Sequence, residues 1–108
     1  MGTEEAPPVR DARDRGRFEI EVDGAVAFLE YARGPSELVL VHTEVPERLA
    51  GRGLGGRLAR HALELAKREG LRVELQCPFQ IAWLDRHPEY RPLLHRPTGS
   101  AGDDPFWL

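Results

Sequence analysis

Glycines and arginines are concentrated between residues 48 and 57, in the run RLAGRGLGGR, directly before a segment with helical periodicity. Gly51, Gly53 and Gly56 form the pattern G-x-G-x-x-G. Glycines leave main-chain N–H groups uncovered by side chains, and the start of a helix carries about half a positive charge. A glycine-rich turn at a helix start therefore predicts a site for a phosphate or pyrophosphate group.

The context of these glycines excludes two familiar phosphate-binding patterns. A dinucleotide-binding fold needs a strand that runs straight into the glycines, whereas residues 46–50 intervene here and two hairpin strands come first. A P-loop needs Lys and then Ser or Thr where this chain has Arg57 and Leu58. The alternative is that the glycines only ease a tight turn. Gly55 and Gly56 argue against it, because each costs the first helical turn about 0.5–1 kcal/mol unless a close approach requires it.

Cys77, the single cysteine, is the second candidate for chemistry. It lies between the strand pattern LRVELQ and Pro78, which suits the first turn of a helix. A helix start lowers the pKa of a thiol, so we predict a reactive thiol there rather than a buried one. Three roles stay open: a proton donor, a nucleophile that accepts an acyl group, or a small residue of the core.

Histidines and aromatic residues offer further candidates. His42 is a candidate base because of its imidazole side chain, and structural hydrogen bonding within its apolar strand is the alternative. We expect His61 to pack on the apolar side of its helix and His87 to cap a helix end. Phe79 and Trp83, four residues apart, are expected to pack against the sheet.

The elements that must position these residues follow from hydrophobic periodicity and turn signals. We predict a hairpin of strands 18–22 and 25–32 around Asp23-Gly24, and a central strand over 37–45 whose apolar run suggests cover on both faces. A helix over 52–69, a strand over 71–76 and a second helix from Pro78 then follow. The prediction is an α/β fold with an antiparallel sheet of about four strands.

Composition narrows the class of protein. The chain has 108 residues, enough for one core, with 41% hydrophobic and 31% charged residues and a net charge of −3. This charge balance does not indicate a basic surface for nucleic-acid binding. A single cysteine excludes an intramolecular disulfide and a zinc site with several cysteines. We expect no metal, no membrane association, a monomer and a cytoplasmic location. Residues 1–15 are expected to form a disordered tail, 16–95 the domain, and 96–108 a mobile tail.

The stretch VPERLAGRGLGGRLARHAL resembles motif A of the GNAT superfamily of acyl-CoA-dependent N-acetyltransferases, in which a [QR]-x-x-G-x-[GA] loop holds the coenzyme A pyrophosphate. Four motifs in order, HTEVPE, GRGLGGRLA, CPF and HPEY, resemble the small single-domain GNAT-like group. The resemblance covers roughly residues 16–95. It implies acetyl-CoA as co-substrate and a GNAT-like fold.

The resemblance also implies roles for particular residues. The [QR] position falls on Ala50, a departure from the pattern, and the tyrosine that serves many GNAT enzymes as proton donor is replaced by Trp83. Cys77, with His42, is then the candidate for the catalytic role. The candidate coenzyme-binding residues are those beside the pantetheine arm and those of the loop: Thr43, Glu44, Val45, Arg52, Gly53, Leu54, Gly55, Gly56 and Arg57.

The predicted function is transfer of an acetyl group from acetyl-CoA to an amine acceptor, which is either a small molecule or a protein. The alternative is a non-enzymatic module that binds coenzyme A or acyl-CoA, favoured by Ala50 and by the missing tyrosine. A third class, an interaction domain without a ligand, would need the glycine loop to be only a turn.

Overall fold

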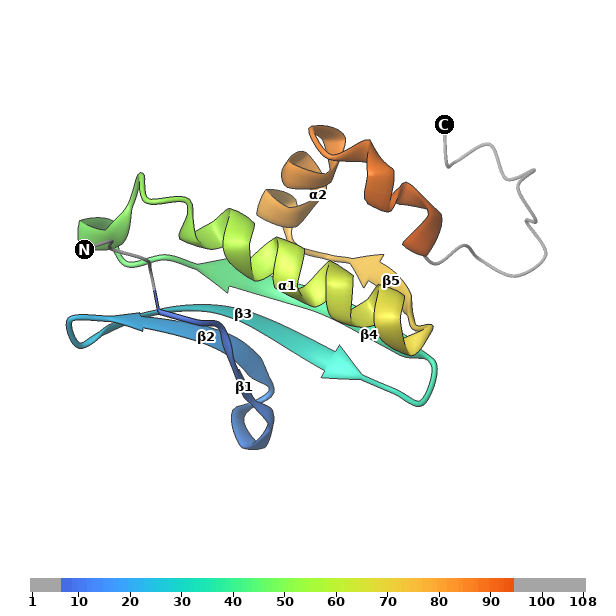
Figure 1. Ribbon diagram of the computed structural model, residues 1–108, viewed down its shortest axis with the longest axis horizontal. Helices are drawn as coiled ribbons and strands as arrows, with labels where there is room; N and C mark the ends of the chain where they lie inside the picture. The colour runs from blue at the N-terminus through green and yellow to red at the C-terminus, as the bar shows by residue number, and fades with distance from the viewer. Residues whose placement is uncertain (1–6, 95–108) are drawn as a thin grey trace.

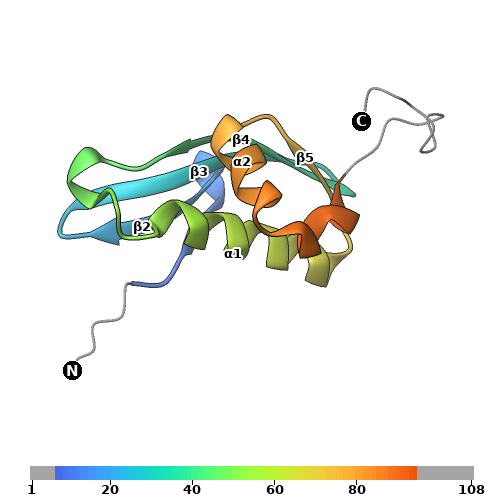
Figure 2. The ribbon, with the colours of Figure 1, turned by 90° about the horizontal axis from the view of Figure 1, so that it is seen from above.

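The computed structural model describes residues 7–94. A sheet of five strands, in the order β1-β2-β3-β4-β5, carries the two α-helices on one of its faces (Figures 1 and 2). The strands are β1 Arg10–Ala12, β2 Arg17–Val22, β3 Ala25–Arg33, β4 Glu37–Glu44 and β5 Arg72–Leu75. The α-helices are α1 Leu54–Glu69 and α2 Pro78–Asp85, and the 3-10 helices are η1 Arg13–Arg15, η2 Glu47–Leu49 and η3 Pro88–Leu93. The predicted α/β class is confirmed.

The hairpin of β2 and β3 forms as predicted, and it turns at Asp23 and Gly24. Both turn residues have positive φ, 52° and 84°, as tight hairpin turns require. The N-terminal flank differs from the prediction, because residues 10–15 form β1 and η1 where a disordered tail was expected. Strand β1 pairs with β2, which raises the strand count from the expected four to five. Residues 1–6 and 95–108 lie outside the described range.

Helix α1 joins β4 to β5, and these two strands are parallel, so the sheet is mixed rather than wholly antiparallel. Helix α1 carries the chain back to the end of the sheet at which β4 began. Strand β5 therefore runs in the same direction as β4. The apolar positions of α1 are buried as their helical spacing predicted: Leu54, Leu58, Ala62, Leu65 and Ala66. Gly70 ends the helix with a φ of 71°, and its N–H donates to the carbonyl of Ala66.

Strand β4 was expected to be covered on both faces, and that prediction is wrong. Leu38 and Leu40 are fully buried beneath the helices, whereas Val39 is half-buried and Val41 is 37% exposed. The reason is that α1 and α2 lie on the same side of the sheet (Figure 2), so that within residues 7–94 no α-helix covers the other face. We call this uncovered side of the sheet the open face.

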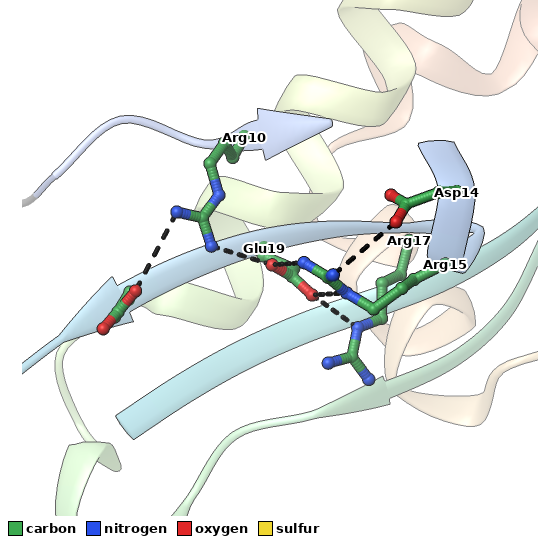
Figure 3. A network of polar contacts seen from close by, with 6 residues as sticks. Arg10, Asp14, Arg15, Arg17 and Glu19 are labelled. Carbon is green, nitrogen blue, oxygen red and sulfur yellow. Dashed lines mark hydrogen bonds and ion pairs between the residues drawn. The ribbon is translucent and has the colours of Figure 1, made fainter. Parts of the chain in front are cut away.

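The open face carries a cluster of arginines around one carboxylate (Figure 3). Glu19 of β2 is only 2% exposed, yet it accepts hydrogen bonds from Arg10 at 2.9 Å, Arg15 at 3.0 and 3.1 Å, and Arg17 at 2.6 Å. Hydrogen bonding from Arg15, with smaller contributions from Arg10 and Arg17, outweighs burial and lowers the pKa of Glu19 to about 2. Arg17 also lies over the ring of Phe28, 4.2 Å from its centroid. These arginines neutralise the protein's own carboxylate and fasten β1 to the sheet.

Across residues 7–94, neither α-helix is both long and apolar enough to cross a membrane.

Candidate functional site

Strands β4 and β5 separate at one end of the sheet. They pair over Glu37–Leu40 and Arg72–Leu75, and the last link is the N–H of Gln76 to the carbonyl of Leu40 at 2.9 Å. Beyond it β4 continues to Glu44, while the other chain segment turns into α2. A cleft of about 460 Å³ lies between the end of β4, the glycine loop and α2, a size typical of ligand sites.

A β-bulge in β4 determines which side chains face this cleft. The pairing with β3 leaves Val41 without a partner between Leu40 and His42. One extra residue reverses the alternation of side chains, so Thr43, opposite the buried Leu29, faces the helices. Thr43 lines the cleft, and His42 is placed on the open face.

The glycine loop supplies uncovered main-chain donors. Gly51 and Gly53 have φ angles of 82° and 77°, and a Cβ at either position would meet no atom within 4 Å. Gly53 is the N-cap of α1, with no side-chain cap, and its carbonyl accepts the N–H of Arg57. Helix geometry therefore leaves the N–H groups of Leu54, Gly55 and Gly56 without an acceptor within α1. This end of α1 can receive an anion.

Gly55 and Gly56 are required for a different reason from the one predicted. A Cβ on Gly55 would lie 2.7 Å from Cζ of Phe79, and one on Gly56 would lie 2.9 Å from Nε1 of Trp83. The absence of a side chain at both positions therefore lets aromatic rings of α2 lie close to the backbone of α1. The close approach that the sequence suggested at these glycines is thus a contact between α1 and α2.

Cys77 is 3% exposed, so the expectation that its thiol is not buried is wrong. Its sulfur lies 3.4 Å from Oγ1 of Thr43, directly behind the wall of the cleft. Burial raises the pKa of this thiol. Hydrogen bonds from the Thr43 hydroxyl and from main-chain N–H groups, including those of Gln80 and Phe79, lower it by more than burial raises it, so the pKa lies below its usual value. The sulfur is therefore sheltered from solvent and yet easier to ionise than an ordinary buried thiol.

Six of the nine predicted coenzyme-binding residues line the cleft: Thr43, Val45, Gly53, Leu54, Gly55 and Gly56. The other three do not. Glu44 is exposed and lies 3.2 Å from the imidazole of His42, Arg52 is exposed outside the cleft lining, and Arg57 donates to the carbonyl of Pro7. His42, the second predicted catalytic residue, is separated from the cleft by the sheet, and we assign it no role there.

Sequence reasoning missed one face of α2. Phe79, Trp83 and Arg86 line the cleft, and their spacing of four and three residues is the signal that identifies a common helical face. Phe79 was expected in the core but is 41% exposed at the cleft, whereas the buried Trp83 packs on Gly56 and stacks on His87 at 3.7 Å. The remaining lining residues are Leu49, which was not predicted, and Ala50 and Gly51, which belong to the predicted glycine loop.

His61 and His87, which lie within the described residues, are placed as predicted. His61 is half-buried with its ring edge against Phe18, and Nδ1 of His87 donates to the carbonyl of Trp83 in the last turn of α2. Of the described residues that line the cleft, none is a tyrosine. The described residues 7–94 hold no group of three or more His, Cys, Asp or Glu side chains that could bind a metal ion.

Comparisons with known proteins agree with this architecture. A solution structure of a GCN5-like protein from Staphylococcus aureus superposes with a TM-score of 0.67 at 22% identity, covering 92% of this chain and 98% of that one. At this identity the match establishes the fold, which is that of a GNAT domain.

The family itself is defined by sequence. The family model described as GCN5-related N-acetyl-transferase matches residues 17–93. Protein NATD1 of Mus musculus is 34% identical over 91 residues, which cover 79% of this chain and 82% of that protein. Protein NATD1 of Gallus gallus is 33% identical over 98 residues, covering 85% and 88% of the two chains. The chain belongs to the GCN5-related N-acetyltransferase family.

Proposed function

We propose that this protein binds acetyl-CoA in the cleft between β4, the glycine loop and α2, and transfers its acetyl group to an amine. One observation carries the proposal. The uncovered N–H groups at the start of α1 belong to residues that line the cleft, and the sulfur of Cys77 lies behind the cleft wall, 3.4 Å from Oγ1 of the lining residue Thr43. The helix start suits an anion, and the nearby thiol suits acyl chemistry.

The residues present fit coenzyme A. The N–H groups of Leu54, Gly55 and Gly56 are donors for the pyrophosphate. Among the residues that the structure describes, no strand pairs with the cleft side of β4 beyond Leu40. The pantetheine arm, an extended amide chain, would hydrogen-bond to this free edge around Thr43 and Val45. The loop lacks the polar side chain that Ala50 replaces, so main-chain donors carry the recognition.

Two routes of acetyl transfer use Cys77. In the direct route the amine nitrogen bonds to the acetyl carbon, the bond from that carbon to the coenzyme A sulfur breaks, and the departing thiolate takes the proton of Cys77. The amine loses its own proton to solvent, and the Cys77 thiolate then regains one. In the covalent route the Cys77 thiolate first bonds to the acetyl carbon and releases coenzyme A thiolate, which is protonated by solvent. The amine then displaces the Cys77 thiolate and releases a proton.

A panel of amines tests the proposal. The protein is incubated with acetyl-CoA and small amines, polyamines or lysine peptides, and both free coenzyme A thiol and acetylated product are measured. We expect slow transfer that tolerates many amines, because residues 7–94 form a minimal sheet with two helices and the cleft is open. One amine turned over far faster than the rest would reveal a specific acceptor pocket. Binding of coenzyme A without transfer to any amine would favour the non-enzymatic binding module, which Ala50 and the absence of a tyrosine from the cleft support.

A further inference from the structure

A buried amide lies next to the sulfur of Cys77. Gln80, in the first turn of α2, is 1% exposed, and its Nε2 donates to Oγ1 of Thr43 at 2.9 Å. Its Oε1 is also buried and has no hydrogen-bond partner among the described residues. A buried polar atom left unpaired costs about 1–3 kcal/mol, a cost that an apolar residue of similar size would avoid. The amide therefore calls for an explanation other than packing.

The direction of the hydrogen bonds explains why an amide is buried at this position. The Nε2 group of Gln80 has only protons to give, so Oγ1 of Thr43 must accept one of them. The hydroxyl of Thr43 then has its own single proton to donate, and the sulfur of Cys77 lies 3.4 Å away. When the thiol is protonated it donates to Oγ1, and when it is ionised the hydroxyl donates to it. Gln80 thus orients a donor toward the thiolate without touching the sulfur itself.

Strand β4 and the first turn of α2 bring these groups together. Thr43 faces α2 only because the bulge at Val41 reverses the alternation of β4. Cys77 lies at the N-cap of α2, and Gln80 is three residues further on, within the same turn. The charged neighbours of Thr43 on β4, His42 and Glu44, lie on the open face. The groups that hydrogen-bond to this sulfur are thus neutral, with no imidazole paired to the thiol.

We propose that Thr43 and Gln80 are positioning residues that act through Cys77: the Gln80 amide fixes the Thr43 hydroxyl so that its proton points to the sulfur and stabilises the thiolate. The stabilisation of the Cys77 thiolate does not depend on the function proposed above, whereas its effect on acetyl transfer rests on that function. The direct route and the covalent route both need a sulfur that gives up its proton near neutral pH. In neither route is the O–H bond of Thr43 broken.

The test is the ionisation of Cys77 in the intact chain, which has no other thiol. Thiolate absorbance near 240 nm is recorded against pH, because it needs no reagent to reach a buried sulfur. Thr43→Val keeps the shape of the side chain and removes the hydroxyl, and Gln80→Met keeps the length and removes the amide. We expect each variant to lower the thiolate fraction at pH 7 about tenfold, the scale of one lost hydrogen bond to a charged group. Thr43→Ser retains the hydroxyl and should therefore keep the thiolate fraction at pH 7 near the wild-type value.

Circular dichroism and thermal melts confirm that each variant is folded before it is titrated. A folded Thr43→Val protein that titrates as the wild type does would overturn the proposal, and so would a Thr43→Ser protein that fails to restore the wild-type curve. The proposed function is scored separately, by coenzyme A binding and acetyl transfer. If the thiol titration shifts as expected and no amine is acetylated, the positioning role stands and the proposed function fails. If transfer occurs and both the thiol titration and the pH profile of transfer are unchanged in Thr43→Val, the positioning role fails alone.

Discussion

Two buried polar clusters lie on opposite faces of the same sheet, and they differ in how fully they are satisfied. On the open face, the carboxylate of Glu19 accepts four hydrogen bonds from three arginines (Figure 3). On the helical face, the Cys77–Thr43–Gln80 cluster has two hydrogen bonds between its side chains and one buried side-chain oxygen without a partner among the described residues. A satisfied cluster stabilises one structure, whereas an incompletely satisfied cluster beside a cleft is typical of a site that acts on something else.

The comparison predicts that changes on the two faces have different consequences. Changes at the cleft should act mainly on binding and transfer, apart from the backbone strain that any substitution of Gly53 introduces at its φ of 77°. Changes at the Glu19 cluster should alter that free energy with little effect on binding.

The largest effect is expected for Gly53→Asp, measured as coenzyme A affinity by isothermal titration. Its carboxylate would stand at the anion site of α1, and two unit charges 4 Å apart repel by about 4 kcal/mol at an effective dielectric constant of 20. This corresponds to a loss of affinity on the order of 10³-fold.

Gly53→Asn is the matched control, because it places a neutral side chain of the same shape on the same φ of 77°. Asn tolerates this backbone conformation about as well as Asp does. Equal affinity losses in the Asp and Asn variants would mean that backbone strain, and not charge, is responsible, and the anion site would then be assigned wrongly.

The next largest effect concerns Cys77→Ala. Coenzyme A affinity should stay near the wild-type value, since the sulfur lies behind the cleft wall, while acetyl transfer should slow by about 10²-fold or more, the usual scale for one acid–base group. Mass spectrometry of the wild-type protein after incubation with acetyl-CoA separates the routes: a labile acetyl adduct on the Cys77 peptide marks the covalent one. Transfer by Cys77→Ala at the wild-type rate would show that the residue belongs to the core.

A smaller effect, on stability instead of function, is expected for Glu19→Gln. The neutral side chain leaves three arginines close together without the charge that balances them, and we expect a loss of about 1–2 kcal/mol in the free energy of unfolding. The estimate stays well below that of a fully buried ion pair, because Arg10 and Arg15 are 57% and 51% exposed and solvent screens them.

Urea denaturation measures this loss, and Glu21→Gln is the control. Glu21 is half exposed with a single 3.8 Å contact to Arg10, so its substitution should change stability by less than about 0.5 kcal/mol. Coenzyme A affinity should be unchanged in both variants. A fall in affinity caused by Glu19→Gln would contradict the separation of the two faces.

The smallest effect is the pH dependence of this difference. The pKa of Glu19 is about 2 in the folded protein against 4.5 for an ordinary glutamate, so its carboxylate stabilises the fold fully above pH 4.5. That contribution is lost as the pH falls from 4.5 toward 2. The difference in free energy of unfolding between wild type and Glu19→Gln should therefore be constant at neutral pH and shrink across this acid window. A difference that persists unchanged at pH 2 would mean that the ionised form of Glu19 is not what stabilises the cluster.

The sequence predicted well what depends on local pattern. The β2–β3 hairpin followed from alternation and Asp23-Gly24, and α1 followed from its apolar spacing and from Gly70. The loop residues Gly53–Gly56 reach the cleft as expected, because a helix start exposes its donors wherever it lies.

What the sequence could not supply depends on contacts between distant segments. The bulge at Val41 has no local signature, and it places Thr43 and His42 on opposite faces of the sheet, so that His42, a candidate base from the sequence, lies away from the cleft. The role of Gln80 depends on its hydrogen bond to Thr43, 37 residues away. Strand β1 is held in part by the hydrogen bond of Arg10 to Glu19, a carboxylate that other arginines also contact. The one-sided cover of β4 follows from the packing of both helices on a single face.

The most direct test of the central claim is a ¹⁵N-edited NMR titration of the 108-residue chain with coenzyme A. If the cleft binds the coenzyme, the largest shift changes should fall on the amides of Gly51, Gly53–Gly56 and Thr43–Val45, and the amides around Glu19 on the open face should stay in place. Shift changes concentrated on the arginine cluster, or no saturable change at millimolar coenzyme A, would contradict the account.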